Sequence, residues 1–197
     1  MTTEHRSQVR RELLDAAAEL FATIGYAEVT HADIAFGAGI GRTTFNENCA
    51  SKEDVHVQLV EDRVPALATE MISGIPEDIG TEERLAELTQ RMVQFVATDP
   101  LGALLHTEVH RLDPASQAQI ADTHVALSAE FVTLYRAGLA EGSFREMPAD
   151  VAARLIYEVI MTAGRVLKVS SRPKERVHEV ADTVTAFLLA GLSAPGA

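Results

Sequence analysis

The sequence predicts an all-α fold in which a small N-terminal three-helix helix-turn-helix domain precedes a larger C-terminal helical domain. Apolar residues recur at helical spacing throughout the 197 residues. Alternating Val/Ile runs joined by Asn-Gly or Asp-Gly turns, which are typical of β-hairpins, are missing from the sequence. No apolar run approaches the roughly 20 residues that span a bilayer, so we expect no membrane segment.

Three short helices are predicted within residues 1–50. The first ends at Gly25, since glycine favours helix C-termini. Two shorter helices follow over residues 32–38 and 42–48, separated by Gly39, which can take the positive φ of a sharp turn. The apolar face of the first helix consists of Leu13, Leu14, Ala17, Leu20, Phe21 and Ile24.

Longer helices are predicted from residue 51 onwards. Ser51 is a favourable N-cap for a connecting helix over residues 51–73, which Pro65 should kink or end. A joint rich in glycine and proline, residues 73–80, then separates this helix from a C-terminal domain over residues 74–197. Within that domain we expect helices over residues 81–98, 100–112, 114–139, 148–169 and 173–192.

The two short helices have the spacing of a helix-turn-helix. Ala35 is small where the helices must cross, and Ile34, Ile40 and Phe45 can close a small core over the first helix. In such a motif the second helix enters the DNA major groove by its N-terminal half. The small-residue spacing alone would equally fit an ordinary helical hairpin.

The wider context favours a DNA-binding domain. The segments that carry a family pattern are Ala17-Ala-Glu-Leu-Phe-Ala-Thr-Ile-Gly-Tyr26, Val29-Thr-His-Ala-Asp-Ile-Ala35, Ala38-Gly-Ile40, Thr44 and Ser51-Lys-Glu-Asp54. Because it contains these segments in order, the stretch of residues 11–55 resembles the N-terminal domain of the TetR (tetracycline-repressor-like) transcriptional regulators. The resemblance implies a homodimer that binds operator DNA through this domain and releases it when a small molecule enters the C-terminal domain.

Eight polar residues form the predicted DNA-binding set. The resemblance implies phosphate contacts for Thr44 and Lys52. The position of the second helix predicts base contacts for Arg42, Thr43 and Asn46. The whole set is Thr30, His31, Arg42, Thr43, Thr44, Asn46, Asn48 and Lys52.

The second helix of the motif departs from the family pattern. Asn46 stands where the family usually has an aromatic residue, Cys49 stands where it usually has Phe, and Gly41 replaces a Ser or Thr that could cap the helix. These departures leave a second interpretation open, in which the protein is a small-molecule-binding or interaction protein on the same fold with weakened or lost DNA binding.

The charge of the chain argues against binding DNA by bulk electrostatics. The sequence has 17 basic and 29 acidic residues, a net charge of −12. Residues 1–56 have five basic and nine acidic residues, a net charge of −4. We therefore expect weak non-specific affinity and strong salt dependence. Arg6, Arg10 and Arg11 could form a basic arm that reaches DNA, or simply lie on the surface of an amphipathic helix.

The last two helices are the most apolar, and the resemblance implies that they pair with their symmetry mates in a four-helix interface. A two-fold dimer suits a palindromic operator of double-stranded DNA. The alternative is that this face is buried within one chain. The predicted interface residues are Leu155, Val159, Leu167, Val184, Phe187 and Leu188.

A ligand pocket is expected among the helices of residues 81–169, where aromatic and Met side chains gather at helical spacing. Each of these could equally be plain core. Because ligand pockets are mostly apolar, we expect a largely apolar small-molecule effector. The predicted lining is Met92, Phe95, Leu105, His106, Val109, Phe131, Tyr135, Tyr157 and Met161.

No catalytic site, metal site or cofactor is predicted. His106 and His110 lie one helical turn apart, a spacing that suits metal ligands, but no third ligand accompanies them. Two Glu-x-x-His pairs, at residues 53–56 and 175–178, have di-iron spacing but lie at charged helix starts. The single Cys49 and a polar N-terminus predict a cytoplasmic protein. The predicted function is a ligand-responsive DNA-binding transcriptional regulator, a repressor rather than an enzyme.

Overall fold

A computed structural model describes residues 3–99, 101–102, 104, 109 and 112–194, and it confirms the all-α fold class. Phe144 and Ser193 form an isolated β-bridge. In chain order the helices are α1 (Thr3–Thr23), α2 (His31–Gly37), α3 (Arg42–Asn48), α4 (Lys52–Ser73), α5 (Thr81–Thr98), α7 (Pro114–Thr123), α8 (Val125–Glu141), α9 (Ala149–Lys168) and α10 (Pro173–Leu192).

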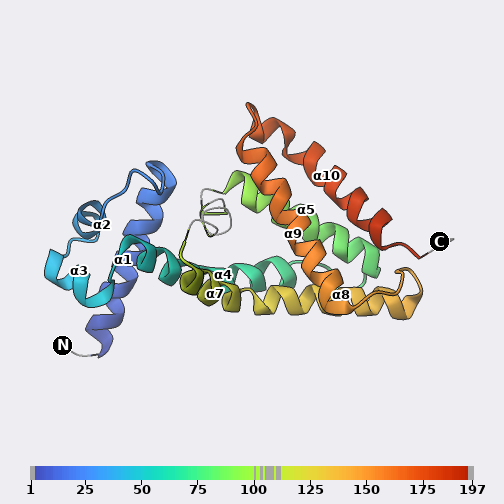
Figure 1. Ribbon diagram of the computed structural model, residues 1–197, viewed down its shortest axis with the longest axis horizontal. Helices are drawn as coiled ribbons and strands as arrows, with labels where there is room; N and C mark the ends of the chain where they lie inside the picture. The colour runs from blue at the N-terminus through green and yellow to red at the C-terminus, as the bar shows by residue number, and fades with distance from the viewer. Residues whose placement is uncertain (1–2, 100, 103, 105–108, 110–111, 195–197) are drawn as a thin grey trace.

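The helices form two groups joined by one long helix (Figure 1). We call α1, α2 and α3 the head, and α5, α8, α9 and α10 the body. α4 runs from the head into the body, and α7 packs alongside α4. The predicted helix over residues 100–112 falls largely outside the described residues.

α1 begins at Thr3, ten residues before Leu13, the first residue of its predicted apolar face. Its early turns are polar, but Val9 lies one turn before Leu13 and is buried with it, so the core face continues toward the N-terminus. The C-terminal end also differs from the prediction, since Ile24 is 54% exposed rather than part of the buried face. The chain then turns at Gly25, whose φ of 97° is the left-handed conformation expected there.

The single helix predicted over residues 114–139 is in fact two helices. They break at His124, whose backbone N–H bonds to the carbonyl of Ala121. In an unbroken helix that N–H would bond to the carbonyl of Ile120, four residues back. Here the Nδ1 atom of the His124 side chain lies 3.0 Å from the Ile120 carbonyl oxygen and takes that position. The Thr123 hydroxyl also donates to this carbonyl, at 2.6 Å, so side chains occupy the Ile120 carbonyl where α7 ends and α8 begins.

α4 confirms the predicted connecting helix and continues through Pro65 without ending. The side chain of Ser51 caps it by accepting the N–H of Asp54 at 3.0 Å, as predicted. Its first half, including Val55 and Leu59, belongs to the core of the head. Its second half, including Ala68, joins the core of the body. α4 is therefore shared by both groups of helices.

The core of the head extends beyond the head itself. Leu104, Leu112 and Ile120 are buried in the same cluster as the apolar residues of α1, α2 and α3. This packing joins Leu104, Leu112 and α7 to the head. Among the described helices none is long and apolar enough to cross a membrane.

Candidate functional site

The α2–α3 unit has the geometry of a helix-turn-helix. Thr30 begins α2 with a capping box: its Oγ1 accepts the N–H of Asp33, and the Asp33 carboxylate accepts the N–H of Thr30 at 2.8 Å. Gly39 adopts the predicted positive φ, 65°, in the turn. Ile34 and Phe45 are buried against α1, so one core fixes the angle between the two short helices.

The N-terminal half of α3 presents an exposed polar surface. Arg42 and Asn46 lie one turn apart on the same face, with Thr43 beside them, and all three are exposed. Their side chains make no hydrogen bond or ion pair with the described part of the chain. Gly41 begins α3 without a side-chain cap, as expected from the missing Ser or Thr. This exposed face contains the three residues predicted to contact DNA bases.

A hollow of about 320 Å³ opens between α2 and α3 beside this face. It is lined by Thr30, His31, Ala32, Ala35, Arg42, Phe45 and Asn46. Four of the eight predicted DNA-binding residues therefore surround one depression of the head surface.

Four residues of the predicted DNA-binding set have partners inside the head. The Lys52 ammonium donates to the Tyr26 carbonyl at 2.9 Å and lies 4.6 Å from the centre of the Tyr26 ring. His31 Nε2 accepts the backbone N–H of Lys52 at 2.9 Å, which fixes that nitrogen as an acceptor. The Asn48 amide donates to the Thr44 carbonyl at 2.7 Å. Together with Thr30, which caps α2, these residues shape the head, and Lys52 does not extend freely from it.

Sequence reasoning missed the residue that ties the head to α4. The Gln58 amide donates to the Asn48 carbonyl at 3.1 Å and to Asp54 at 3.2 Å. Its carbonyl oxygen accepts from Arg10 Nε at 3.0 Å. Arg10 therefore lies on α1 with an intramolecular partner rather than in a free basic arm, and Arg6 also lies on α1. A Gln between the apolar residues Val57 and Leu59 was the signal available in the sequence.

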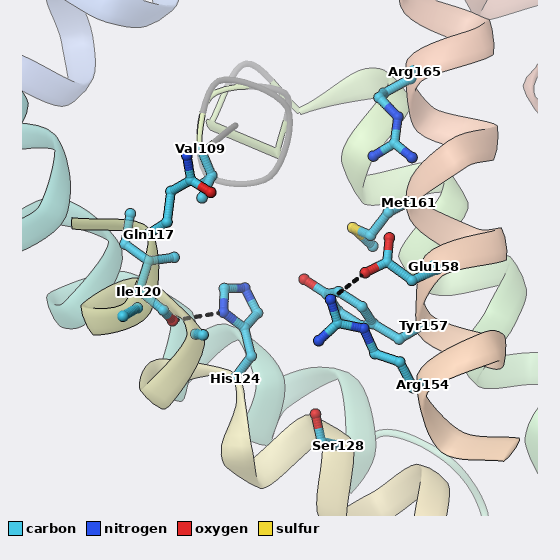
Figure 2. Close-up of a pocket in the computed structure, with 12 residues that line it drawn as sticks. Val109, Gln117, Ile120, His124, Ser128, Arg154, Tyr157, Glu158, Met161 and Arg165 are labelled. Carbon is cyan, nitrogen blue, oxygen red and sulfur yellow. Dashed lines mark hydrogen bonds and ion pairs between the residues drawn. The ribbon is translucent and has the colours of Figure 1, made fainter. Parts of the chain in front are cut away.

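A second candidate site is a cavity of about 640 Å³ between α7, α8 and α9 (Figure 2). The side chains from α7 and α8 face those from α9 across it. Its size lies within the range of small-molecule sites. It is lined by Val109, Gln117, Ala118, Ile120, Ala121, His124, Ser128, Arg154, Tyr157, Glu158, Met161 and Arg165.

His124 and Tyr157 face each other across the cavity, with ring centroids 5.7 Å apart in an edge-to-face arrangement (Figure 2). Burial lowers the pKa of His124, because the interior disfavours its charged form. Burial is also the main reason that the pKa of Tyr157 is raised. Both side chains are therefore neutral at pH 7, and Tyr157 keeps its hydroxyl proton.

Among the described lining residues, the charged groups all come from α9. Arg154 pairs with Glu158 at 2.7 Å. Arg165 lies at the other end of the lining and donates to the Thr162 hydroxyl at 2.8 Å. Since residues 154, 158, 161 and 165 recur every three or four positions, they lie on one helix face.

The predicted pocket residues divide into three groups. Val109, Tyr157 and Met161 line the cavity. Phe131 and Tyr135 are buried in the body core and do not line it, which corrects the prediction. Met92 and Phe95 line a different, small cavity against α4. Leu105 and His106 fall outside the described residues, and so does His110.

Sequence reasoning also missed the polar side of this cavity. Gln117, His124, Arg154, Glu158 and Arg165 were not predicted. The spacing of the last three with Tyr157 and Met161 was a usable signal, but only packing shows which face of α9 borders the space.

α7 lies between the cavity and α4. One part of α7, including Ala118 and Ala121, lines the cavity. Ile120 also reaches the core of the head, and Gln119 donates to Glu61 on α4 at 2.7 Å. α7 is therefore in contact with both the cavity and α4.

The outer face of α9 and α10 is apolar and exposed. Leu155 is 55% exposed and Phe187 is 65% exposed, while Val159 and Val184 are partly buried beside them. All four line a groove of about 590 Å³ between the two helices. Leu167 and Leu188 are instead buried within the chain's own core, so the prediction that they form a dimer interface is wrong.

Two family models match this chain. Residues 13–59 match the bacterial regulatory proteins of the tetR family, and residues 78–165 match the Tetracyclin repressor-like, C-terminal domain. Together the two matches cover more than half of the chain. None of the curated protein sequences compared with this chain matches it.

Solved structures of transcriptional regulators share the fold. FadR from Bacillus subtilis, in complex with stearoyl-CoA, has a TM-score of 0.78 at 20% identity, over 92% of this chain and 98% of its own. A putative tetR family regulator from Shewanella sp. PV-4 has a TM-score of 0.74 at 19% identity, over 95% of this chain and 99% of its own. RolR, in complex with resorcinol, has a TM-score of 0.73 at 18% identity, over 97% of this chain and 90% of its own. At these identities the likeness shows the fold.

Proposed function

The chain belongs to the TetR family of bacterial regulatory proteins, and on that premise we propose that it is a repressor released from its operator by a small molecule. One observation carries the DNA-binding part of this proposal: Arg42, Thr43 and Asn46 form an exposed polar face at the start of α3, with no partner among the described residues. Arg and Asn are the side chains that best read guanine and adenine edges in the major groove.

The cavity between α7, α8 and α9 supports the ligand-binding part. The solved structures of FadR and RolR, which share the fold, contain stearoyl-CoA and resorcinol respectively. Ile120 and Met161 give the cavity an apolar part. We therefore propose an effector with an apolar body, bound in this cavity.

The exposed groove of α9 and α10 supports a homodimer that binds a palindromic operator. A two-fold dimer would present two copies of α3 to two half-sites, and the spacing of these copies decides whether both fit the DNA. In our proposal the bound effector shifts α7, and α7 in turn shifts α4. The distance between the two heads of the dimer then changes. Ligand binding then favours one of two conformations that differ in operator affinity.

An electrophoretic mobility shift with the DNA upstream of the protein's own gene tests this function. We expect a specific shift at moderate salt that R42Q weakens about tenfold or more, because a bidentate arginine contact contributes roughly 1–3 kcal/mol. R136Q is the matched control, since Arg136 is an exposed arginine of α8 in the body.

The alternative is a protein of this fold that no longer binds DNA. Gly41 without a cap, the acidic head and the internal position of the Lys52 ammonium favour it. A specific shift of a palindromic fragment would reject this alternative. If no candidate operator is shifted at any salt concentration, the repressor proposal fails.

A further inference from the structure

The charge of the cavity between α7, α8 and α9 contrasts with that of the whole chain. The chain has a net charge of −12, yet the described lining residues of the cavity include two arginines, Arg154 and Arg165, and one acid, Glu158. Both arginine side chains are exposed, so water screens them in part, but the described lining still has an excess of positive charge. The lining therefore favours a ligand of negative charge.

The two arginines are not equivalent. Arg154 is already paired with Glu158, at 2.7 Å. Arg165 donates to the hydroxyl of Thr162 and has no carboxylate partner in the part of the chain that the structure describes. Its guanidinium points toward the cavity in Figure 2. Arg165 is thus the positive charge that remains to be balanced.

Tyr157 adds a neutral hydrogen-bond donor to the same wall. Its hydroxyl points into the cavity toward His124 (Figure 2) and makes no hydrogen bond with the described residues. Burial keeps the hydroxyl protonated by raising the pKa of Tyr157, so it is a donor at neutral pH. Ile120, Met161 and the alanines of α7 supply the apolar remainder of the lining.

We propose that this cavity binds an organic anion, a small molecule with an apolar or aromatic body and one acidic group that lies beside Arg165. This inference rests on the proposed function, in that it takes the cavity as the effector site. The acidic group accepts hydrogen bonds from the guanidinium of Arg165, and the body of the molecule lies against Ile120 and Met161. A cationic ligand is disfavoured, because the one acid among the described lining residues, Glu158, is already paired with Arg154.

Two fluorescent probes that differ by one acidic group test the proposal. 1-Anilinonaphthalene-8-sulfonate has the apolar rings and a sulfonate, and N-phenyl-1-naphthylamine has the same rings without it. Both are titrated into the full-length protein at fixed ionic strength. We expect R165Q to weaken binding of the sulfonate about fivefold to tenfold, the effect of a charge-assisted hydrogen bond reduced for solvent exposure. Binding of the neutral probe should change less than about twofold.

Three further variants locate the probe and fix the sign of the effect. E158Q removes the competing acid and releases Arg154, so it should strengthen binding of the sulfonate. A121W fills the cavity and should abolish binding of both probes. R172Q removes an exposed arginine that pairs with Glu175 outside the cavity, and should change neither.

The proposal is overturned if R165Q leaves the sulfonate affinity unchanged or weakens both probes equally. It is also overturned if A121W leaves binding of the sulfonate intact, since the probe would then lie elsewhere. A mobility shift on the same proteins separates this result from the proposed function. Anion binding without any operator shift would leave the anion site standing and reject the regulator.

Discussion

The exposed phenylalanine of α10 gives the sharpest prediction about assembly. Phe187 is 65% exposed and lines the groove between α9 and α10. A Phe side chain has on the order of 200 Å² of surface, so about 130 Å² remain to be covered. At about 25 cal/mol per Å², covering that area contributes roughly 3 kcal/mol in each protomer. In a two-fold dimer the same contact occurs twice.

The substitution F187A removes most of this contribution. Since alanine keeps about a third of the apolar area, the loss is roughly 2 kcal/mol per protomer and roughly 4 kcal/mol per dimer. The dimer Kd should therefore rise up to about a thousandfold. Sedimentation velocity over a range of protein concentrations measures this change.

The matched control is F36A. Phe36 is 89% exposed, but it lies on α2 in the head, away from the α9–α10 groove. We expect F36A to leave the dimer Kd within about twofold of the original value. If F187A raises the Kd less than about tenfold, or if F36A raises it as much as F187A, the reasoning about this interface is refuted.

Three further predictions concern stability. Y135F removes a buried hydroxyl that accepts the Met147 N–H at 2.7 Å, and should lower the free energy of unfolding by about 1–3 kcal/mol in urea titrations; an unchanged value would contradict it. Because burial lowers the pKa of His124, the unfolded chain binds a proton below pH 6.5 that the folded chain does not, so the protein becomes less stable as the pH decreases. H124Q should reduce this pH dependence of the melting temperature, and an equal pH dependence in both proteins would contradict the prediction. G41S should stabilise the protein by about 0.5–1 kcal/mol, since the extended backbone there accepts a capping serine and a Cβ meets no atom within 4 Å; a lower melting temperature would argue otherwise.

Helix boundaries followed from short stretches of sequence. Gly25 and Gly39 take the positive φ that their positions in the pattern indicate, and Ser51 caps α4 as predicted. Caps and turns depend on residues within about four positions of each other, so the sequence contains all the partners. The same is true of the apolar residues Ile34 and Phe45, which are buried as the motif requires.

The break between α7 and α8 shows where local reasoning fails. Residues 115–137 contain no glycine or proline, so the local sequence gives no strong signal for a break at His124. It ends α7 because its ring lies in the interior near Tyr157 and its Nδ1 atom lies beside the Ile120 carbonyl. The contact of His124 with Tyr157 on α9 thus helps to set the boundary between α7 and α8.

The candidate sites also depended partly on local sequence and partly on tertiary packing. The sequence placed Tyr157 and Met161 in a pocket but assigned Phe131 and Tyr135 to it as well, because aromatic residues at helical spacing suit a core and a pocket equally. It also predicted Lys52 as a DNA contact, whereas the ammonium bonds to the carbonyl of Tyr26. Such partners are more than 20 residues apart, and only folding brings them together.

The amino-acid sequence by itself determined the helical fold class, the helix-turn-helix and most helix ends, because hydrophobic periodicity, caps and glycine turns are local properties of the chain. The tertiary structure alone decided which face of α9 borders a cavity and that Leu167 and Leu188 belong to the core. It also left Arg165 as the arginine of that cavity without a carboxylate partner among the described residues. Those outcomes depend on which helices pack together, since a side chain's neighbours come from distant segments and not from the pattern around it.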